Sequence, residues 1–585
     1  MLNEHAHRGV EDGPLADLAA GPSWTWVRRG VQAPRRVRHR GTVPRPAALT
    51  VSADRYETAR THPRAPRSPV LYPGTFASSA PNRAAIVDAD TDAVTTYAEL
   101  DERSARLASL LRGHGLQPGD HVAFLSTNAP EIFEIYWAAM RSGLYVTGVN
   151  SHLTAAEAAY IVGDCGASVL VVSGDLADLA VAVLDQCPAV TLALAFGGPV
   201  DGFDDYAAGL AAGSSERAES QPAGADMLYS SGTTGRPKGV LPPLPTYQVD
   251  EPGDMFAAVF GPLYGFSTDT VYYSAAPLYH AAPLRFGGIV HRFGGTVVLA
   301  HGFDPEQALA AIEEHRVTHS QWVPTMFVRM LKLPAETRAR YDVSSLEVAV
   351  HAAAPCPVEV KQQMIDWWGP ILHEYYSSTE ANGITLIGPQ DWLEHPGSVG
   401  RAGLGVIHVC DPAGEELPPG EIGVIWFERD TMPFSYHNDS DKTALAQHPD
   451  HPTWSAVGDI GYVDDEGYLY LTDRTSFMII SGGVNIYPQE AEDALVLHPA
   501  VQDVAVIGVP DDEMGEQVKA VVQPAEGITT GPELADELIA FVRERIAHYK
   551  APRSVDFIEE LPRTATGKLV KRVLAQQYRE TSVPR

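Results

Sequence analysis

The chain has 585 residues, of which 45% are hydrophobic and 20% charged, and its formal net charge is −31. This length allows several domains and a large core. The acidic balance excludes a nucleic-acid binder, because a phosphate backbone requires a basic face. No apolar run reaches the roughly 18 residues that a membrane helix needs. The four cysteines lie far apart without metal-ligand spacing, so we expect reduced thiols in a cytoplasmic protein.

The first 70 residues differ in composition from the rest. They contain 12 arginines, no lysine and six acidic residues, and prolines interleave with the arginines. Such a segment cannot bury enough apolar surface to fold alone, so we predict a disordered or loosely docked extension over 1–70. A basic arm that touches an acidic partner or a membrane surface is the alternative. The pairs Arg28-Arg29 and Arg35-Arg36 resemble a twin-arginine signal, but no apolar segment follows either pair, and export is not expected.

Folded sequence is expected from Leu71 onward, with strand and helix patterns in alternation. Apolar runs predict strands, and apolar residues at helical spacing predict helices. The predicted strands are 122–125, 168–172, 294–301 and 319–323, and the predicted helices are 95–111, 128–141, 305–315 and 326–332. This alternation predicts an α/β fold with largely parallel sheets.

The last third of the chain changes character twice. Residues 397–473 are rich in Gly, Pro and short strand patterns, which predicts an antiparallel portion. After Arg474 the patterns predict strands at 501–508 and 517–522 and a helix at 533–548. We therefore expect a large domain over 71–474, a small α+β domain over 475–576 and a tail over 577–585.

The most informative stretch runs from Tyr229 to Val240. Glycines let backbone N–H groups turn inward around an anion, hydroxyls add donors and a lysine adds a charge suited to phosphate. The residues that would do so here are Ser230, Ser231, Gly232, Thr233, Thr234, Gly235 and Lys238. The stretch is not a Walker P-loop, because Arg236 and Pro237 separate the last of these glycines from the lysine. We predict a polyphosphate-binding loop, with a mobile linker as the alternative.

This stretch closely resembles the phosphate loop of the adenylate-forming superfamily, which contains acyl-CoA synthetases, firefly luciferase and the adenylation domains of peptide synthetases. The resemblance implies a large AMP-binding domain followed by a small mobile domain. It also implies ATP, Mg²⁺ and coenzyme A as the small molecules involved.

Two further segments fit that resemblance. His280 follows Ala276-Pro277-Leu278-Tyr279, where the superfamily has an aromatic residue or histidine against the acyl carboxylate; a packed core histidine is the alternative. Ala353 and Ala354 precede a proline, and the superfamily stacks adenine on such a segment. Taken alone, that stretch would be read as an ordinary strand-to-helix turn, with Pro357 starting a helix over 358–368.

The segment 374–380 carries residues for nucleotide and metal. Tyr375 and Tyr376 can cover a nucleobase, Thr379 can donate to a phosphate and Glu380 can hold Mg²⁺. A polar loop at a strand end with a solvated glutamate is the alternative. The superfamily usually has glycine where this chain has Ser377, and we expect the added side chain to face the carboxylate–phosphate junction.

The resemblance places ribose and pantetheine contacts in the next segments. Asp459 would accept from the ribose hydroxyls and Arg474 would join it, with a simple turn carboxylate as the alternative for Asp459. Val457 stands where threonine is common. Gly482 and Gly483 would let the pantetheine arm pass, with a plain turn as the alternative, and the hinge of the small domain would fall on Ser476.

Near the end of the chain, Lys568 follows Thr566-Gly567 on an expected loop. In the superfamily this lysine bridges the carboxylate and the α-phosphate during adenylation. A solvated basic helix start is the alternative. Lys238, His280, Thr379 and Lys568 are the predicted catalytic residues.

Together these segments predict an acyl-CoA synthetase that forms an acyl-adenylate and then a CoA thioester. The apolar run Trp322–Phe327 favours a bulky hydrophobic acid that is fatty, steroid-like or terpenoid. Two alternatives remain: a ligase that mainly thioesterifies a preformed adenylate, and a nucleotide-binding regulator without turnover. The expected partners are the acid, ATP or AMP and CoA, without nucleic acid or an integral membrane segment; a homodimer stays open.

Overall fold

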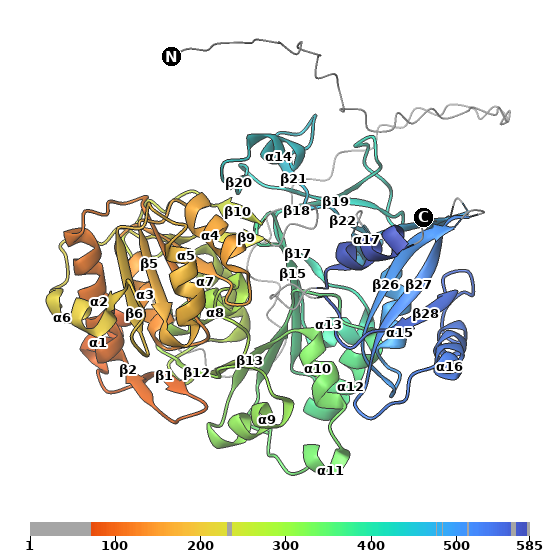
Figure 1. The fold of residues 1–585 in the computed structure, drawn as a ribbon, viewed down its shortest axis with the longest axis horizontal. Coiled ribbons are helices and arrows are strands. Elements are labelled where there is room, and N and C mark those ends of the chain that lie inside the picture. Colours follow the sequence, from red (N-terminus) through yellow and green to blue (C-terminus); the bar gives the residue numbers. More distant parts are fainter. Residues whose placement is uncertain are drawn as a thin grey trace, which may run out of the picture. The chain divides into compact units, whose positions relative to one another are not determined.

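The computed structural model describes residues 72–230, 237–474, 477–482, 484–511, 514–562 and 569–581. In this part of the chain the strands form five sheets (Figure 1). The helices are α1 (Pro73–Ser79), α2 (Tyr97–Gly113), α3 (Glu131–Met140), α4 (Ala155–Asp164), α5 (Ala177–Leu184), α6 (Tyr206–Ala212), α7 (Met255–Tyr264), α8 (Ala281–Arg292), α9 (Pro305–Glu314), α10 (Pro324–Leu331), α11 (Ala335–Arg338), α12 (Val358–Trp368), α13 (Pro389–Glu394), α14 (Ser440–Leu445), α15 (Pro488–Leu495), α16 (Pro532–Arg543) and α17 (Lys571–Thr581).

The largest sheet has nine strands. In spatial order they are β17 (Arg401–Leu404), β16 (Ile384–Ile387), β15 (Leu372–Ser377), β14 (Val348–His351), β13 (His319–Trp322), β11 (Val271–Ser274), β12 (Thr296–Leu299), β1 (Ala84–Asp88) and β2 (Val94–Thr96). From β15 to β1 all neighbours are parallel, and the outer strands are antiparallel. The carboxyl ends of the central strands therefore share one edge.

A second sheet of six strands is parallel throughout. Its order is β7 (Asp204–Asp205), β6 (Leu192–Phe196), β5 (Val169–Ser173), β3 (His121–Leu125), β4 (Tyr145–Val149) and β8 (Ala225–Asp226). Its central strands are apolar without alternation, as expected for strands that helices cover on both faces.

Helices and the two parallel sheets alternate in layers. On β3, Val122 and Phe124 face a core that includes residues of α2, α3, α7, α8 and the nine-stranded sheet. Ala123 and Leu125 face the opposite core, which α4 and α5 cover. The far face of the nine-stranded sheet is covered by α9, α10, α12 and α13. Parallel sheets with helices on both faces confirm the predicted α/β class.

Three smaller sheets complete the described part. A three-stranded antiparallel sheet contains β9 (Leu228–Ser230), β10 (Lys238–Leu241) and β20 (Ser435–Tyr436). An antiparallel sheet contains β18 (Val406–Cys410), β19 (Gly423–Glu428), β21 (Trp454–Ser455), β22 (Asp459–Val463) and β23 (Leu469–Arg474), as the composition of 397–473 predicts. The last sheet contains β24 (Ile479–Ser481), β25 (Val484–Ile486), β26 (Val501–Asp511), β27 (Gly515–Pro524) and β28 (Ser554–Phe557).

The predicted elements are present with small shifts at their ends. Helix α2 begins after Thr96, whose side chain accepts from the Glu99 amide while the Glu99 carboxylate accepts from the Thr96 amide. This reciprocal capping box explains why the helix starts there. Helix α12 spans Val358–Trp368 after Pro357, as predicted. Helix α16 ends at Arg543, earlier than the predicted 548, and the chain continues in turns up to Pro552.

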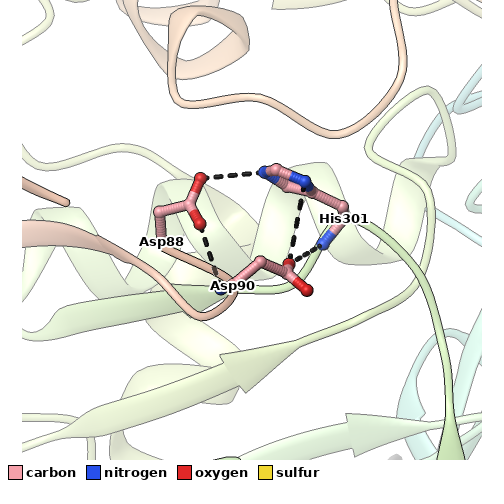
Figure 2. Close-up of side chains that lie close together, drawn as sticks. All are labelled: Asp88, Asp90 and His301. Atoms are coloured by element: carbon pink, nitrogen blue, oxygen red, sulfur yellow. Dashed lines mark hydrogen bonds and ion pairs between the residues drawn. The ribbon is translucent and has the colours of Figure 1, made fainter. Parts of the chain in front are cut away.

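Strand β1 is tied to the end of β12 by a cluster of polar side chains (Figure 2). Asp88 Oδ1 accepts from the amides of Asp90 and Thr91 at 3.0 and 2.9 Å, and Asp88 Oδ2 lies 2.8 Å from His301 Nε2. Asp90 Oδ2 accepts from the His301 amide at 2.9 Å. The cluster closes the β1–β2 turn against the neighbouring strand.

Candidate active site

Three of the predicted segments emerge at the same edge of the nine-stranded sheet. His280 follows β11, Ala353 and Ala354 follow β14, and Thr379 and Glu380 follow β15. The carboxyl ends of parallel strands form the usual ligand-binding edge of an α/β sheet. The topology therefore brings together segments separated by about a hundred residues of sequence.

The predicted phosphate loop connects two antiparallel strands. Lys238 pairs with Ser230, and Gly239 pairs with Tyr229, so the loop joins the ends of a β9–β10 hairpin. A Cβ atom on Gly239 would lie 3.0 Å from the Tyr229 ring, and the Tyr229 hydroxyl donates to Asp164 at 2.5 Å. Ser231, Gly232, Thr233, Thr234 and Gly235 lie outside the described residues. The described ends fix where this loop leaves and rejoins the sheet.

Glu380 is buried and is bound by a tyrosine from another sheet. The Tyr436 hydroxyl donates to Glu380 Oε1 at 2.8 Å, and the Tyr436 ring lies 4.8 Å from Lys238 Nζ. Glu380 is 8% exposed. Tyr436 thus contacts both residues: its hydroxyl binds Glu380, the predicted metal ligand, and its ring faces Lys238, the predicted phosphate lysine.

The loop that carries Thr379 and Glu380 is held by its own polar groups. The Ser377 hydroxyl donates to the Gly383 carbonyl at 2.8 Å, and the Ser378 hydroxyl donates to Asn382 at 2.8 Å. Arg429 donates to the Ala381 carbonyl at 3.1 Å. The Ser377 hydroxyl bonds to the loop backbone and closes the turn.

Asp459 accepts two hydrogen bonds from predicted nucleotide residues. The Tyr376 hydroxyl donates to Asp459 Oδ2 at 2.7 Å, and Arg474 Nε donates to Oδ1 at 3.0 Å. Asp459 and Arg474 are also paired across β22 and β23. Burial raises the pKa of Tyr376, and the charge of Asp459 raises it further, so the phenol remains a donor.

The Lys238–Tyr436–Glu380 group and the Tyr376–Asp459–Arg474 group lie close enough to interact electrostatically. Burial and Glu380 raise the pKa of Tyr436, while Arg474 acts in the opposite direction. The charge of Glu380 also contributes to the raised pKa of Tyr376, after burial and Asp459. Five predicted site residues, Lys238, Tyr376, Glu380, Asp459 and Arg474, therefore belong to one polar region.

Tyr375 lies on the other face of β15 from Tyr376, because successive strand residues alternate. Its ring is 5.2 Å from Phe260 and 5.9 Å from Phe286, and its hydroxyl accepts from Gln321 at 3.4 Å. Of the two predicted tyrosines, Tyr376 is the one that shares a face with Asp459.

His280 is the N-cap residue of α8, and its loop is held by a buried asparagine. Asn128 Nδ2 donates to the carbonyls of Ala276 and Ala300 at 3.1 and 2.9 Å, and Asn128 Oδ1 accepts from the Leu278 amide at 2.8 Å. Asn128 follows β3 of the six-stranded sheet, so one side chain joins the carboxyl ends of both parallel sheets.

The predicted adenine segment has an unusual backbone. Ala353 has φ +76°, in the left-handed region that favours glycine, and Ala353 and Ala354 are both exposed. A non-glycine residue in this conformation costs about 1 kcal/mol or more, and such residues cluster at functional sites. The exposed backbone of this segment is consistent with a surface for a flat ligand.

Behind the adenine segment lies a buried ion pair between α12 and β15. Lys361 Nζ is 2.6 Å from Glu374 Oε2; Lys361 is 0% and Glu374 5% exposed. His351 of β14 pairs with Glu374 in register. Burial raises the pKa of Glu374, although Lys361 acts in the opposite direction. The pair fixes α12 against β15, the strand that carries Tyr376.

Gly482 lies at the β24–β25 turn with φ +57°. A Cβ atom there would lie 2.4 Å from Met514 Cε, so the position combines a left-handed backbone with a close neighbour. Gly483, Ser476 and Lys568 lie outside the described residues.

Two places in the described residues could hold a cation. Glu380 Oε1 is bound by Tyr436, and Mg²⁺ requires only one or two protein carboxylates, so Glu380 fits the predicted role. Asp88, Asp90 and His301 also offer ligand atoms within 4.8 Å of one another. Asp88 Oδ1 already accepts from two amides of the turn, and Asp88 Oδ2 bonds to His301 Nε2 at the end of β12, which explains that cluster structurally.

Sequence reasoning missed Tyr436 and Asn128. Tyr436 contacts Glu380 and Lys238, which are 56 and 198 positions away, and no local pattern marks it. Asn128 was placed at the start of a predicted helix, and its contacts with the His280 loop depend on how the two sheets pack.

Comparisons with known proteins agree with this geometry. Residues 75–437 match the family model of the AMP-binding enzymes, and residues 490–568 match that of the AMP-binding enzyme C-terminal domain. A feruloyl-CoA synthase from an Amycolatopsis species is 35% identical over 495 residues, which cover 83% of this chain and 94% of the relative.

Two further proteins are similar over most of their length. A Rhodococcus jostii CoA ligase for a 7a-methyl-1,5-dioxo-octahydroindenyl propanoate is 32% identical over 516 residues, 84% of this chain and 95% of the relative. The crystal structure of the anthranilate CoA ligase AuaEII with anthranoyl-AMP gives a TM-score of 0.75 at 25% identity, over 88% of this chain and 99% of that one.

No helix among the described residues combines the length and the apolar character needed to cross a membrane. The family models, the relatives and the α/β architecture point to the same assignment. The chain belongs to the AMP-binding enzyme family of the adenylate-forming superfamily and is an AMP-forming acid–CoA ligase.

Proposed function

We propose that the chain converts a bulky, largely apolar carboxylic acid to its CoA thioester through an acyl-adenylate. The observation that carries the proposal is that the segment 376–380 at the end of β15 joins the Lys238–Tyr436–Glu380 group to the Tyr376–Asp459–Arg474 group. The first group offers a cation and a carboxylate for a metal–polyphosphate, and the second offers a carboxylate for hydroxyl groups. A nucleoside triphosphate with its metal has both parts.

In the first step an oxygen of the acid attacks the α-phosphorus of ATP, and the bond to the β-phosphate breaks to release pyrophosphate. Lys238 and Thr379 would bind phosphate oxygens, and Asp459 and Arg474 would hold the ribose. Tyr376, Ala353 and Ala354 would border the adenine. His280 would lie against the acid carboxylate, and Lys568 would bridge that carboxylate and the α-phosphate. These residues act by position and charge.

Glu380 would hold Mg²⁺. When bound, Mg²⁺ neutralises phosphate oxygens and favours the departure of pyrophosphate. The buried carboxylate with one oxygen fixed by Tyr436 is a suitable protein ligand for it.

In the second step the thiolate of CoA attacks the acyl carbonyl, and AMP leaves with the electrons of the mixed-anhydride bond. Gly482 and Gly483 would border the pantetheine arm. The two steps would use two positions of a small domain over 475–576 relative to a large domain over 71–474, with a hinge at Ser476. The change from the β22–β23 sheet to the β24–β27 sheet supports this division.

Evidence for the acid comes from the relatives rather than from the run Trp322–Phe327. Trp322 and Phe327 are 1% and 0% exposed and pack in the core under the nine-stranded sheet. The relatives are CoA ligases for feruloyl, fused-ring and fatty acids. An acid with an aryl or fused-ring body is therefore the first candidate, and a fatty acid the second.

The test is a release assay over a panel of acids with ATP, Mg²⁺ and CoA, with AMP and thioester both measured. The panel contains ferulate, indoleacetate, a fused-ring propanoate and a long-chain fatty acid, with acetate and amino acids as comparison compounds. We expect thioester and AMP in equal amounts with one of the first four. Preference for acetate or an amino acid would contradict the substrate class, and pyrophosphate release without thioester would contradict the second step.

A further inference from the structure

We propose that Tyr436 is a positioning residue that keeps the metal-binding carboxylate and the phosphate-binding lysine apart and correctly oriented. The inference rests on the proposed function of Glu380 and Lys238. Tyr436 is the side chain that contacts both: its hydroxyl donates to Glu380 at 2.8 Å, and its ring lies 4.8 Å from Lys238 Nζ.

The phenol donates to one oxygen of the Glu380 carboxylate. Tyr436 is 8% exposed, and its hydroxyl lies 2.8 Å from Glu380 Oε1. This hydrogen bond fixes the orientation of the carboxylate and leaves Glu380 Oε2 to act as a ligand.

The backbone of Tyr436 is fixed from two sides. Val240 of β10 pairs with Tyr436 of β20, which ties the tyrosine to the strand that begins at Lys238. The Tyr436 amide also donates to Thr443 Oγ1 at 2.9 Å, and Thr443 in turn donates to the Asp439 carbonyl at 3.0 Å. The position of the phenol is thus linked to the end of the phosphate loop.

The charges of Lys238 and Glu380 explain why a group that separates them is useful. A lysine ammonium and a buried carboxylate attract each other strongly at low dielectric, and direct pairing would use up both charges. The ring instead receives the cation on its face through a cation–π contact, while the hydroxyl holds the carboxylate. Lys238 and Glu380 remain available for phosphate and metal.

The test compares Tyr436→Phe, Tyr436→Leu and Tyr206→Phe. Tyr206 is a matched control, because it is also buried and its hydroxyl, on α6, donates at 2.9 Å to a carboxylate, that of Glu134 on α3. Binding of Mn²⁺ with ATP is measured by electron paramagnetic resonance, and acid-dependent ATP–pyrophosphate exchange is measured against Mg²⁺, ATP and acid concentrations.

We expect Tyr436→Phe to weaken Mn²⁺ binding in the ATP complex by about 10-fold, with the KM for the acid unchanged. Tyr436→Leu should in addition raise the KM for ATP, because the cation–π contact is lost. Tyr206→Phe should bind Mn²⁺ as the wild type does. Thr443→Val should shift Mn²⁺ binding in the same direction as Tyr436→Phe, by a smaller factor.

Wild-type Mn²⁺ affinity in Tyr436→Phe, or an equal loss in Tyr206→Phe, would overturn the proposal. Failure of the proposed function has a different signature, since the wild-type protein would then show no exchange with any acid. The Mn²⁺–ATP measurement tests Tyr436 even in that case. If Tyr436→Leu does not fold, the comparison of Tyr436→Phe with Tyr206→Phe still decides the outcome.

Discussion

Asp459 illustrates at the residue scale how the site is prepared for its ligand. Its two oxygens receive hydrogen bonds from Tyr376 and Arg474, on different strands. Each carboxylate oxygen has a second lone pair, so both can accept again from ribose hydroxyls. These two bonds orient the side chain, which would reduce the cost of ordering it for the proposed ribose contact.

Replacement of Asp459 by Asn removes the charge and one acceptor. A hydrogen bond to a charged group contributes about 1.5–3 kcal/mol, so we expect the KM for ATP to rise by roughly 10- to 100-fold. Initial rates with ATP and with 2′-deoxy-ATP test whether a lost contact with the ribose hydroxyl causes the higher KM. The wild type should discriminate between the two nucleotides, and Asp459→Asn should discriminate less; unchanged discrimination would mean that the carboxylate does not contact the ribose.

Asp88 gives a prediction about pH and stability. Burial would raise its pKa, but hydrogen bonds from His301, Thr91 and Asp90 outweigh burial and lower it below the model-peptide value. A carboxyl group whose pKa is lower in the folded state stabilises the fold above its unfolded pKa, near 3.9 for Asp. That contribution is lost as the pH falls through the folded value.

The measurement compares urea unfolding of the wild type and Asp88→Asn between pH 7 and pH 3. We expect the wild type to be more stable at pH 7 and the difference to shrink below about pH 4. Because Asp88 lies at the end of β1 and outside the proposed site, activity at pH 7 should be unchanged. A pH-independent difference would assign the effect to packing instead of to charge.

Single residues also show what sequence could not decide. The resemblance predicted Asp459 as a ribose ligand, and the residue types of the segment 374–380 predicted Glu380 as a metal ligand; that both carboxylates are buried became visible only in the structure. The run Trp322–Phe327 suited a ligand pocket and a core equally well, and the structure places Trp322 and Phe327 in the core. The sequence also does not determine the direction of the Ser377 side chain, and in the structure its hydroxyl bonds to the Gly383 carbonyl.

At the element scale, the Lys361–Glu374 pair joins α12 to β15. Both groups are almost fully buried, and removal of one partner from such a pair typically costs about 3–5 kcal/mol. We expect Lys361→Met to destabilise by this amount at pH 8, measured by urea unfolding. Without Lys361 the folded-state pKa of Glu374, already raised by burial, rises further.

The pH dependence separates this mechanism from simple loss of packing. A carboxyl group with a raised folded pKa stabilises the fold in its protonated form, and that stabilisation disappears as the pH rises. Lys361→Met should therefore lose less stability at pH 5 than at pH 8. The double variant with Glu374→Leu should recover most of the loss; a double variant as unstable as the single one would contradict the account.

Elements with local signals were predictable, and elements that depend on distant partners were not. The two capping residues of α2 are three positions apart, and the apolar runs of β3 and β5 are each five residues long, so each signal is local. Strand β20 has only two residues, and its pairing with β10 across about 200 positions has no local signature. Tyr436 could not be found for the same reason.

At the scale of the whole molecule, the proposed reaction needs Lys568 for one step and Gly482 for the other. We expect Lys568→Ala to slow acid-dependent ATP–pyrophosphate exchange by roughly 10²–10³. ATP binding, measured by calorimetry, should persist, because Lys238, Asp459 and Arg474 are unchanged. Thioester formation from a synthetic acyl-adenylate and CoA should also persist.

Lys550→Ala provides the comparison variant, since Lys550 forms an ion pair with Glu490 and has no proposed role in either step. It should carry out both reactions at the wild-type rate. Equal loss of both half-reactions in Lys568→Ala would mean that this lysine supports the fold rather than adenylation alone.

The order of the motifs in the sequence predicted that they converge, and the structure brings the loops after β11, β14 and β15 to one edge of the nine-stranded sheet, because parallel strands deliver their following loops to the same edge. Asn128 joins the two sheets through its bonds to Ala276 and Ala300. These contacts depend on how the sheets pack against each other, which no local sequence pattern predicts.

The left-handed conformation of Ala353 bears on the conformational cost of binding a ligand at this segment. Ala353 directly follows His351 and Ala352, which are 0% and 6% exposed, and a strained conformation persists where the surrounding structure determines it. If this segment borders adenine as proposed, a planar ring system would find its surface already shaped by folding and would lose little affinity to rearrangement of the protein.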